Sequence, residues 1–395
     1  MKLLLLGLMF CDESLEEALR SSKVGVQMAP HLFQNRLLSG LKAQDEVDVS
    51  VLNIPPTGSF PLANKKLYSK SYLHEDGKQI GFINLPFIKH VVQQRKLKKE
   101  ILKWLKDKND SYIVVYSLYK PFLKALDKII KKTKVNVCLI QTDAIPGRGG
   151  MSTSLKAKRL GDKLVGYTKN FSSFVVLSEW LNEKLEVGDR PTVLTECICD
   201  RTQIPSKTKS SSEKIYLYTG STAGAYGFRE FLEAFTKLKD CKLWICGAGD
   251  CDEYIYNLSK EYKNIRHFGY LNQSEVAKLR DECDFLINPR RPSGNYTKYS
   301  FPSKTAEYLM SEKPVVMYKL EAIPNDYDQY INYLTGNTAD EICQEIVKLN
   351  DKNYSQLVQK AKKARAFMLE NKTEENQANK IIRMLKVDLD NKKSK

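Results

Sequence analysis

The segment from residue 286 to 316, LINPRRPSGNYTKYSFPSKTAEYLMSEKPVV, holds the side chains best suited to bind a phosphate-containing ligand. Arg290 and Arg291 follow a strand-like run, and Ser303 and Lys304 open a helix-like run that carries Glu307. The start of a helix attracts anions, to which Ser303 adds a donor and Lys304 a cation. Glu307 can accept hydrogen bonds from ribose hydroxyls. Together these residues predict a nucleotide site. The simpler alternative makes Ser303 a helix N-cap and Glu307 a favourable early-helix charge.

Two glycine-containing turns precede this segment, and each follows a strand-like run. The first, YLYTGSTAGAYGF, contains Gly220 and Gly227, and backbone N–H groups at such a turn can hold a diphosphate. The second, LWICGAGD, contains Gly247 and Gly249, which allow close backbone approach where a base or ribose can sit. Neither turn is specific alone, because glycines at such turns also serve packing. The second turn also lacks the remaining glycine of the dinucleotide fingerprint.

The first half of the chain offers fewer candidates. In VCLIQTDAIPGRGG, Asp143 follows a strand-like run directly, where it could face the hydroxyls or the developing positive charge of a sugar. A turn-forming Thr-Asp pair explains the same residues equally well. Arg148 lies in the glycine-flanked loop that follows and is a candidate for binding an anionic acceptor.

Strand-like and helix-like runs alternate along the whole chain, which predicts parallel α/β architecture. Expected strands are 3–8, 47–52, 112–116, 135–140 and 174–177, then, after a polar stretch, 215–218, 242–246, 265–270, 285–288 and 314–318. Residues 11–29 are expected to form a loop. We predict an N-terminal Rossmann-like domain over 1–200, a linker over 201–213, a C-terminal Rossmann-like domain over 214–365, and a closing helix with a frayed tail over 366–395. Ligands of such folds bind at the carboxyl ends of the strands, so we expect a cleft between the domains.

Composition narrows the class of protein. The 395 residues are 42% hydrophobic and contain no apolar run of 18 residues, which argues against a membrane-spanning helix. The opening MKLLLLGLMF fits a buried first strand better than a signal peptide, because the acidic Asp12 and Glu13 follow and no cleavage site is visible. Nine scattered cysteines and four histidines form no metal-binding pattern. We expect free thiols in a reducing compartment, without zinc or disulfides.

The formal charge of +16 is concentrated between residues 87 and 134, where 14 Lys and Arg stand against four Asp and Glu. Basic residues alternate there with Phe, Ile, Leu and Trp at helical spacing, which suits a helix on an anionic membrane surface. An equally good interpretation is two helices packed on a sheet with a solvated lysine face. Nucleic acid is not expected as a partner, because no nucleic-acid-binding motif accompanies the charge.

The segment 286–316 resembles the retaining family 4 glycosyltransferases. The likeness is to a bacterial capsular and exopolysaccharide subgroup in which N-P-R, a short loop and S-F-P-S-K-x-x-E-Y-L lead into K-P-V-V. The resemblance is specific over about 215–331 and weak elsewhere. It implies a GT-B fold whose last helix crosses back to the N-terminal domain, and retaining transfer from a UDP- or GDP-sugar without a metal or other cofactor. It also implies a saccharide acceptor on a lipid diphosphate, and a cytoplasmic enzyme held at the inner face of the membrane.

The resemblance also assigns roles to residues. Lys304 and the backbone of Phe301, Pro302 and Ser303 would bind the donor diphosphate, Arg290 would reach the phosphates or the sugar, and Glu307 would hold the ribose. The donor-phosphate loop would contain Gly220, Tyr226 and Gly227. Together with Asp143, which is proposed from its position directly after a strand, Arg290 and Lys304 are expected to be catalytic.

This chain departs from the family pattern at several places. Tyr226-Gly227 stands where a lysine often precedes the glycine, Tyr299 replaces a glutamate, and Glu312 replaces a glycine at a helix end. The glycine-rich loop that admits the acceptor is reduced to Gly25. These departures keep open a non-catalytic subunit that supports a partner transferase. A sugar-nucleotide epimerase is a further rival, against which the 286–316 motif argues.

Overall fold

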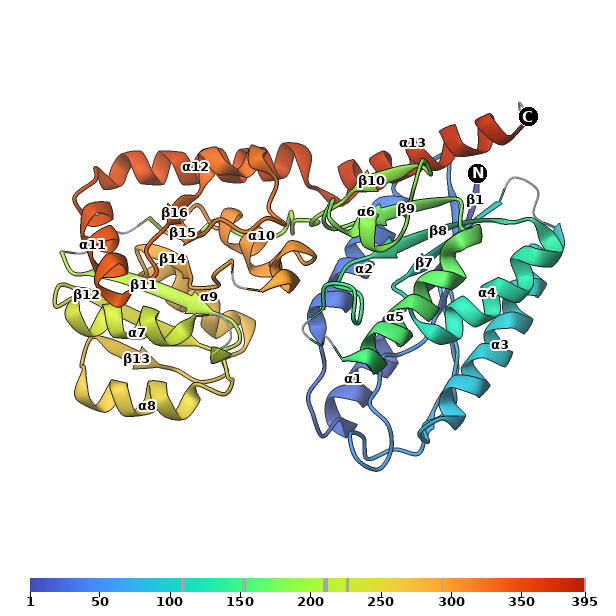
Figure 1. The fold of residues 1–395 in the computed structure, drawn as a ribbon, viewed down its shortest axis with the longest axis horizontal. Helices are drawn as coiled ribbons and strands as arrows, with labels where there is room; N and C mark the ends of the chain where they lie inside the picture. The colour runs from blue at the N-terminus through green and yellow to red at the C-terminus, as the bar shows by residue number, and fades with distance from the viewer. Residues whose placement is uncertain are drawn as a thin grey trace. The chain divides into compact units, whose positions relative to one another are not determined.

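The computed structural model describes residues 1–107, 111–150, 152, 154–208, 212–224, 227–292 and 294–393. The chain forms two compact units, each with its own parallel sheet (Figure 1). The first unit contains Met1–Ile198 and Thr373–Lys395, and the second contains Cys199–Lys372. The chain therefore passes from one unit to the other twice, at residues 198–199 and 372–373. The polar residue Ser206, which lies in the segment expected to be a linker, is buried in the second unit and donates its N–H to the Ser311 carbonyl at 2.9 Å.

The sheet of the first unit has the order β10-β9-β8-β7-β1-β2-β5-β4. Its strands are β1 (Lys2–Gly7), β2 (Asp48–Asn53), β4 (Tyr72–His74), β5 (Gly77–Gln79), β7 (Ser111–Tyr116), β8 (Asn136–Gln141), β9 (Ser173–Val176) and β10 (Thr192–Leu194). All neighbours pair in parallel except β4 with β5. The order of strands along the sheet reverses between β1 and β7, which makes their carboxyl ends the switch point of this unit.

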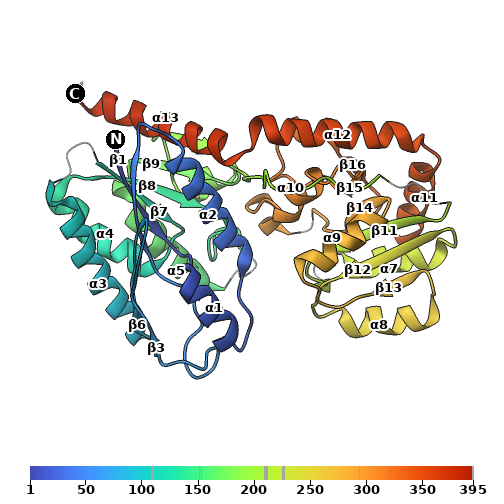
Figure 2. The ribbon, with the colours of Figure 1, turned by 180° about the vertical axis from the view of Figure 1, so that it is seen from behind.

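Helices cover both faces of this sheet, as the apolar β1 requires. They are α1 (Asp12–Ser21), α2 (Met28–Lys42), α3 (Ile88–Trp104), α4 (Lys120–Thr133), α5 (Leu155–Gly166), α6 (Leu181–Lys184) and α13 (Glu374–Lys393). Leu3 and Leu5 pack with α2 and α13 in one core, while α3 and α4 pair with each other (Figure 1). The C-terminal helix α13 lies beside α2 (Figure 2), so closely that a Cβ on Gly40 would come within 2.0 Å of the Glu374 carbonyl oxygen.

The second unit is a six-stranded parallel sheet of order β13-β12-β11-β14-β15-β16. Its strands are β11 (Lys214–Thr219), β12 (Cys241–Cys246), β13 (Ile265–His267), β14 (Phe285–Asn288), β15 (Val315–Tyr318) and β16 (Asn332–Leu334). Taken in chain order this is the Rossmann order 3-2-1-4-5-6, so the switch point lies between β11 and β14. The core includes a stacked pair, Tyr216 and Phe285, with ring centroids 4.6 Å apart.

The helices of this unit lie between successive strands or follow the last strand, as in a doubly wound α/β fold. They are α7 (Phe228–Lys237), α8 (Asp252–Glu261), α9 (Gln273–Glu282), α10 (Ser303–Leu309), α11 (Ala339–Asn350) and α12 (Tyr354–Asn371), with 3-10 turns η4 (Asn295–Lys298) and η5 (Asn325–Tyr330). The predicted parallel α/β architecture is thus confirmed. Every strand expected from the sequence is present, with ends that differ by at most three residues.

The expected loop over residues 11–29 is wrong, because α1 occupies most of it. The buried face of α1 consists of Ser14, Ala18 and Ser21. Small residues at helical spacing fit a close approach to the sheet but form no apolar stripe, so periodicity did not reveal the helix. Also unexpected are α5 and the short antiparallel ribbon of β3 (Tyr68–Ser69) with β6 (Phe82–Ile83).

Replacement of Gly247 by alanine tests how tightly the turns after β11 and β12 pack. A Cβ at Gly247, where φ is +147°, would lie 1.7 Å from the Gly220 carbonyl oxygen. We expect Gly247→Ala to lower the free energy of unfolding by about 3 kcal/mol, through strain and overpacking. Gly269→Ala is the matched control: its φ is +67° but no atom lies within 4 Å of the new Cβ, so it should cost only about 1–2 kcal/mol. Equal losses in urea unfolding of the two variants would contradict this account.

Candidate functional site

The carboxyl ends of β11 and β14 are the place where a fold of this order binds ligands, and the predicted motif converges there. β11 ends at Thr219 and is followed by Gly220, whereas β14 ends at Asn288 and is followed by Pro289 and Arg290. The helix α10 begins at Ser303 beside these ends. The candidate site therefore consists of two strand ends and the start of one helix.

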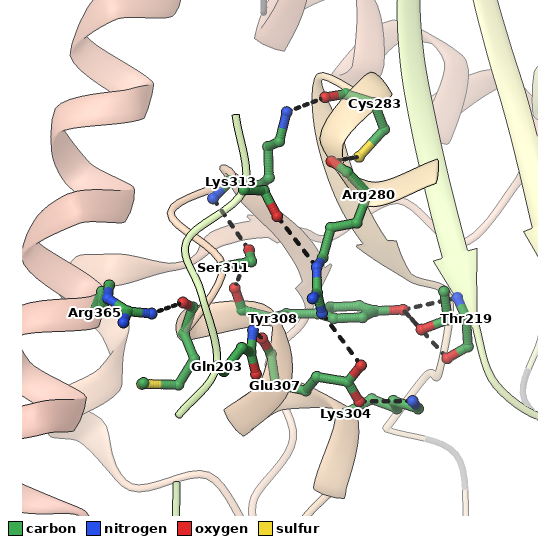
Figure 3. A network of polar contacts seen from close by, with 12 residues as sticks. Gln203, Thr219, Arg280, Cys283, Lys304, Glu307, Tyr308, Ser311, Lys313 and Arg365 are labelled. Atoms are coloured by element: carbon green, nitrogen blue, oxygen red, sulfur yellow. Dashed lines mark hydrogen bonds and ion pairs between the residues drawn. The ribbon is translucent and has the colours of Figure 1, made fainter. Parts of the chain in front are cut away.

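A buried tyrosine fixes α10 to the end of β11 (Figure 3). The hydroxyl of Tyr308, a residue only 1% exposed, accepts a hydrogen bond from the Thr219 backbone N–H at 2.9 Å. It lies 3.1 Å from Thr219 Oγ1 and donates to the Thr219 carbonyl at 3.3 Å. Burial raises the pKa of Tyr308 well above its usual value, so the hydroxyl keeps its proton. The Tyr308 hydroxyl thus links α10 to β11, and it both donates and accepts a hydrogen bond there.

Lys304 and Glu307 project from α10 and form a half-exposed ion pair (Figure 3). Lys304 Nζ donates to Glu307 Oε2 at 2.6 Å, and Arg280 Nη1, from α9, lies 3.4 Å from Glu307 Oε1. Burial raises the pKa of the Cys246 thiol, at the end of β12, to about 11, and the charge of the Lys304 ammonium partly opposes that rise. The Glu307 carboxylate therefore lies between two cations at the carboxyl edge of the sheet.

The glycine turns serve packing more than hydrogen bonding to a ligand. Gly220 N–H donates to Cys246 at 2.9 Å and Gly247 N–H to Gly269 at 2.8 Å, both to backbone carbonyls. Gly249 N–H donates to Asp252 at 3.0 Å and Gly227 N–H to Gly224 at 3.1 Å. Since these four amides already have acceptors, the glycines contribute close approach rather than donors. Tyr226 lies outside the described residues.

The two arginines after β14 lie in different environments. Arg290 is half-buried, with its guanidinium carbon 5.2 Å from the centre of the Tyr296 ring. Arg291 turns toward the start of α7, where a Cβ on Gly227 would lie 2.7 Å from Arg291 Cδ. Arg291 Nη1 lies 3.5 Å from Glu230. Gly227, with φ of +79°, is thus required both by its backbone conformation and by Arg291.

The remaining residues of the motif differ in exposure. Phe301 and Pro302 are buried, and the ring of Phe301 packs against Tyr327 at 5.8 Å, so only their backbone can meet a ligand. Ser303 is exposed and is the first residue of α10, whose N-cap is Pro302 without a side-chain cap. The capping explanation of Ser303 is therefore wrong.

The residues proposed from the first half of the chain belong to the first unit. Asp143 follows β8 and is exposed; its Oδ2 accepts from Thr142 Oγ1 at 3.1 Å. Arg148 contacts the carboxylates of Asp162 and Glu186, each at 2.7 Å, which weakens its attraction for another anion. Gly25 is exposed, with φ of +79°, and its carbonyl accepts from Ser22 Oγ at 2.7 Å.

Metal-ligating side chains do not gather in groups of three or more in the part of the chain that the structure describes. All nine cysteines are free thiols, and seven of them are buried. Each thiol whose pKa shifts is raised by burial, as for Cys138 and Cys283, at about 12 each. The seven buried thiols are core residues rather than nucleophiles.

One protein-family model matches a large part of the second unit. Residues 213–352 match the family described as glycosyl transferases group 1. The second unit is similar to glycosyl transferases of this group. The matched region includes both glycine turns and the whole of the 286–316 motif. No curated protein sequence matches the chain.

Solved structures extend the likeness to the whole chain. Sucrose-phosphate synthase from Thermosynechococcus elongatus has a TM-score of 0.66 at 12% identity, over 98% of each chain. The E. coli trehalose-6-phosphate protein bound with UDP-2-fluoro glucose also has a TM-score of 0.66, at 8% identity, over 98% of this chain and 99% of that one. A TarM variant from S. aureus, in complex with UDP and alpha-GlcNAc-glycerol, has a TM-score of 0.56 at 14% identity, over 78% and 60%.

These likenesses confirm the fold: it is GT-B, with two Rossmann-like domains. The family match, together with this fold, supports sugar transfer as the activity. Three features of the site were not visible in the sequence: Arg280 beside Glu307, the Tyr308–Thr219 contact, and the packing of Arg291 on Gly227. Only the last had a sequence signal, a glycine just before a helix.

Removal of the Tyr308 hydroxyl should destabilise the candidate site without leaving a cavity in the core, because the aromatic ring stays. In Tyr308→Phe the buried Thr219 N–H loses its acceptor, which should cost about 1–3 kcal/mol of unfolding free energy. In the control Tyr216→Phe, the lost partner is the half-buried Asn350 side chain, at 2.6 Å, which water can reach, so the cost should be nearer 0.5–1.5 kcal/mol. Hydrogen exchange of peptide 214–220 should speed up much more in Tyr308→Phe. Unchanged exchange in that variant would refute the anchoring role.

Proposed function

We propose that this protein is a retaining glycosyltransferase that takes a sugar from a UDP- or GDP-sugar and transfers it to a saccharide acceptor in cell-surface polysaccharide synthesis. The observation that carries the proposal is the Lys304–Glu307–Arg280 cluster at the switch point of the second unit. It supplies cations for a diphosphate and a carboxylate for ribose hydroxyls at the edge where such folds bind nucleotides. The match of this region to glycosyl transferases group 1 supports the same reading.

Donor binding would change the partners of the cluster. The side chain of Lys304 is 40% exposed. Its ammonium can leave Glu307 for a phosphate oxygen, because Arg280 continues to neutralise the Glu307 carboxylate. Glu307 then accepts from the ribose hydroxyls. Arg290, at the end of β14, would reach the phosphates or the sugar. The backbone of Phe301, Pro302 and Ser303 would face the diphosphate.

The proposed chemistry relies on charge rather than on a metal. As the bond from the anomeric carbon to the diphosphate breaks, negative charge grows on the leaving oxygen, and Lys304 and Arg290 stabilise it. The acceptor hydroxyl attacks on the face from which the diphosphate departs, so the configuration is retained. Asp143, at the carboxyl edge of the first unit, would face the donor sugar and its developing positive charge. The first unit would bind the acceptor, with Gly25 near it and Arg148 as a weaker candidate.

A non-catalytic subunit is the alternative, and one observation favours it. The segment after β1, where the family has a glycine-rich loop, is occupied by the helix α1. That arrangement narrows the space available to a sugar beside β1. Turnover of a donor by the isolated protein separates the two functions.

The first test is release of nucleotide diphosphate from a panel of UDP- and GDP-sugars. We expect slow hydrolysis or transfer with one donor by the wild type. Lys304→Ala and Glu307→Ala should each lose about 10- to 100-fold in donor affinity, since a hydrogen bond to a charged group contributes about 1.5–3 kcal/mol. Asp143→Asn should bind the donor as the wild type does but turn it over more slowly.

Lys237→Ala is the matched control. Lys237 pairs with Asp340 at 2.6 Å on the surface of the same unit, the same distance as in the Lys304–Glu307 pair. This variant should keep full activity. If no donor binds or turns over, the non-catalytic subunit becomes the better account, and Lys304 and Glu307 are left with a purely structural ion pair.

We further propose that the acceptor is lipid-linked and that the enzyme docks on the anionic cytoplasmic face of a membrane through residues 87–134. Within the described residues, no helix is long and apolar enough to span a bilayer. Along α3 and its N-cap Phe87, exposed residues recur every four positions: Phe87 and Val91, then Arg95, Lys99 and Lys103. Phe87 is 87% exposed. An apolar end followed by a basic stretch suits interfacial binding.

Vesicle flotation tests this surface. Because each basic residue near an anionic surface contributes about 1 kcal/mol, neutralising three should weaken binding to phosphatidylglycerol vesicles about 100-fold. The test variant combines Arg95→Gln, Lys99→Gln and Lys103→Gln. The control combines Lys239→Gln, Lys278→Gln and Lys362→Gln, three exposed lysines of the second unit. Equal binding by both variants would show that α3 is only a packed helix with a solvated face.

A further inference from the structure

The turn that follows β7 contains a strained serine at the switch point of the first unit. Ser117 comes directly after the last residue of β7 and has φ of +66°, a left-handed conformation that residues other than glycine rarely adopt. Lys134, Glu186 and Glu312 also have positive φ, but each follows the end of a helix, where this conformation is a common cap. Strain of this kind persists only where the surrounding structure imposes it, and it is frequent at functional sites.

A buried glutamine holds this turn to the turn after β8. Ser117 N–H donates to the Ile140 carbonyl at 2.7 Å, and Leu118 N–H donates to Gln141 Oε1 at 3.2 Å. Gln141 is only 4% exposed, and its Nε2 donates to the Asp143 carbonyl at 2.7 Å. One side-chain amide therefore fixes the backbone at two neighbouring strand ends, one of which carries Ser117 and the other Asp143.

The carboxylate of Asp143 lies at the exposed end of a buried chain of hydroxyls. Thr142 Oγ1 donates to Asp143 Oδ2 at 3.1 Å and lies 3.2 Å from the Tyr116 hydroxyl. Because an ionised carboxylate can only accept, the single hydrogen of the Thr142 hydroxyl points to Asp143, and Tyr116 must then donate to Thr142. Burial raises the pKa of Tyr116 well above its usual value, so this hydroxyl keeps its proton. The orientation of the Asp143 carboxylate is thus set by groups inside the first unit.

The hydroxyl of Ser117 is available to a ligand. The side chain is half-buried, and its hydroxyl has no hydrogen-bond partner among the residues that the structure describes. A glycine would adopt φ of +66° without strain, so the serine hydroxyl stands at this position at a cost in stability. A hydroxyl and a carboxylate at the carboxyl edge of one sheet suit two hydroxyls of a sugar. The negative charge of Asp143 disfavours a phosphate in the same place.

We propose that Ser117 binds a hydroxyl of the transferred sugar next to Asp143, and that Gln141 is the positioning residue for both. The Ser117 hydroxyl donates to one sugar oxygen, while the Asp143 carboxylate accepts from a neighbouring sugar hydroxyl. Gln141 does not touch the sugar, because its amide is buried and bonded on both sides to the backbone of the two turns. The inference rests on the proposed function, which assigns Asp143 to the donor sugar.

The test compares two replacements of Ser117 in the full chain, with the UDP- or GDP-sugar of the panel that the wild type turns over. Ser117→Ala removes the hydroxyl and keeps the strain, whereas Ser117→Gly removes both. We expect kcat to fall about 3- to 10-fold in both variants, the effect of one hydrogen bond. Inhibition by the free nucleotide diphosphate should be unchanged, because Ser117 would not meet the nucleotide. Ser117→Gly should unfold at a higher temperature than Ser117→Ala, so an equal loss of kcat in the two variants is not a loss of stability.

Ser69→Ala is the matched control. Ser69 is also half-buried in the first unit, and its hydroxyl likewise has no partner among the described residues. This variant should turn over the donor as the wild type does. If Ser117→Ala and Ser117→Gly are as active as Ser69→Ala, Ser117 does not bind the sugar and the inference is overturned.

Gln141→Leu tests the positioning role. Without the amide, the two strand ends are no longer held to each other, so kcat should fall at least as far as in Ser117→Ala. Adding Ser117→Ala to Gln141→Leu should then cost little more, because the hydroxyl is already misplaced. The same loss from Ser117→Ala in both backgrounds would overturn the role of Gln141. If the wild type turns over no donor, the proposed function fails and this inference with it. Turnover that Asp143→Asn slows and Ser117→Ala does not would overturn only the role of Ser117.

Discussion

The candidate site depends on one buried hydroxyl. Tyr308 reaches from α10 to the last residue of β11, and its oxygen meets the N–H, the carbonyl and the side chain of Thr219. Both partners are at most 4% exposed, so water cannot replace this contact, and leaving it unmade is costly. The helix that carries Lys304 and Glu307 is therefore fixed to the strand end where a nucleotide would lie. A site of this kind needs such support, because charges placed an ångström away lose much of their effect.

The glycine turns impose a second constraint, and it shifts the chemistry onto side chains. Gly247 and Gly220 touch through their backbones, and a Cβ on Gly249 would lie 2.7 Å from the backbone of Thr222. Their amides are satisfied inside the protein, so they offer a ligand close approach and little hydrogen bonding. Under the proposed function, neutralisation of the donor diphosphate then falls to the cations Lys304 and Arg290. Arg291 is packed under the start of α7, where its aliphatic part fills the space that Gly227 leaves.

The sequence predicted the strands well because parallel strands are buried on both faces and read as apolar runs. It also placed Lys304 and Glu307 on one helix, since a contiguous motif fixes their spacing. It missed what depends on distant parts of the chain: Arg280 lies 27 positions before Glu307, on a helix without buried residues. It missed α1 because Ser14, Ala18 and Ser21 form no hydrophobic face. Glu312, noted as unusual where a glycine is common, has φ of +62°, the conformation that favours glycine.

The two units differ in the polar groups near the carboxyl ends of their central strands. At the switch point of the second unit, the cations Lys304 and Arg280 flank the carboxylate of Glu307. In the first unit, the buried polar groups near the ends of β1 and β2 include the amides of Asn53, Gln79 and Asn84, all at most 2% exposed. Gln79 Oε1 alone accepts from Cys11 N–H, Ser14 and Asn53. These buried, hydrogen-bonded amides hold the ends of β1 and β2 rigid without placing a charge in the core.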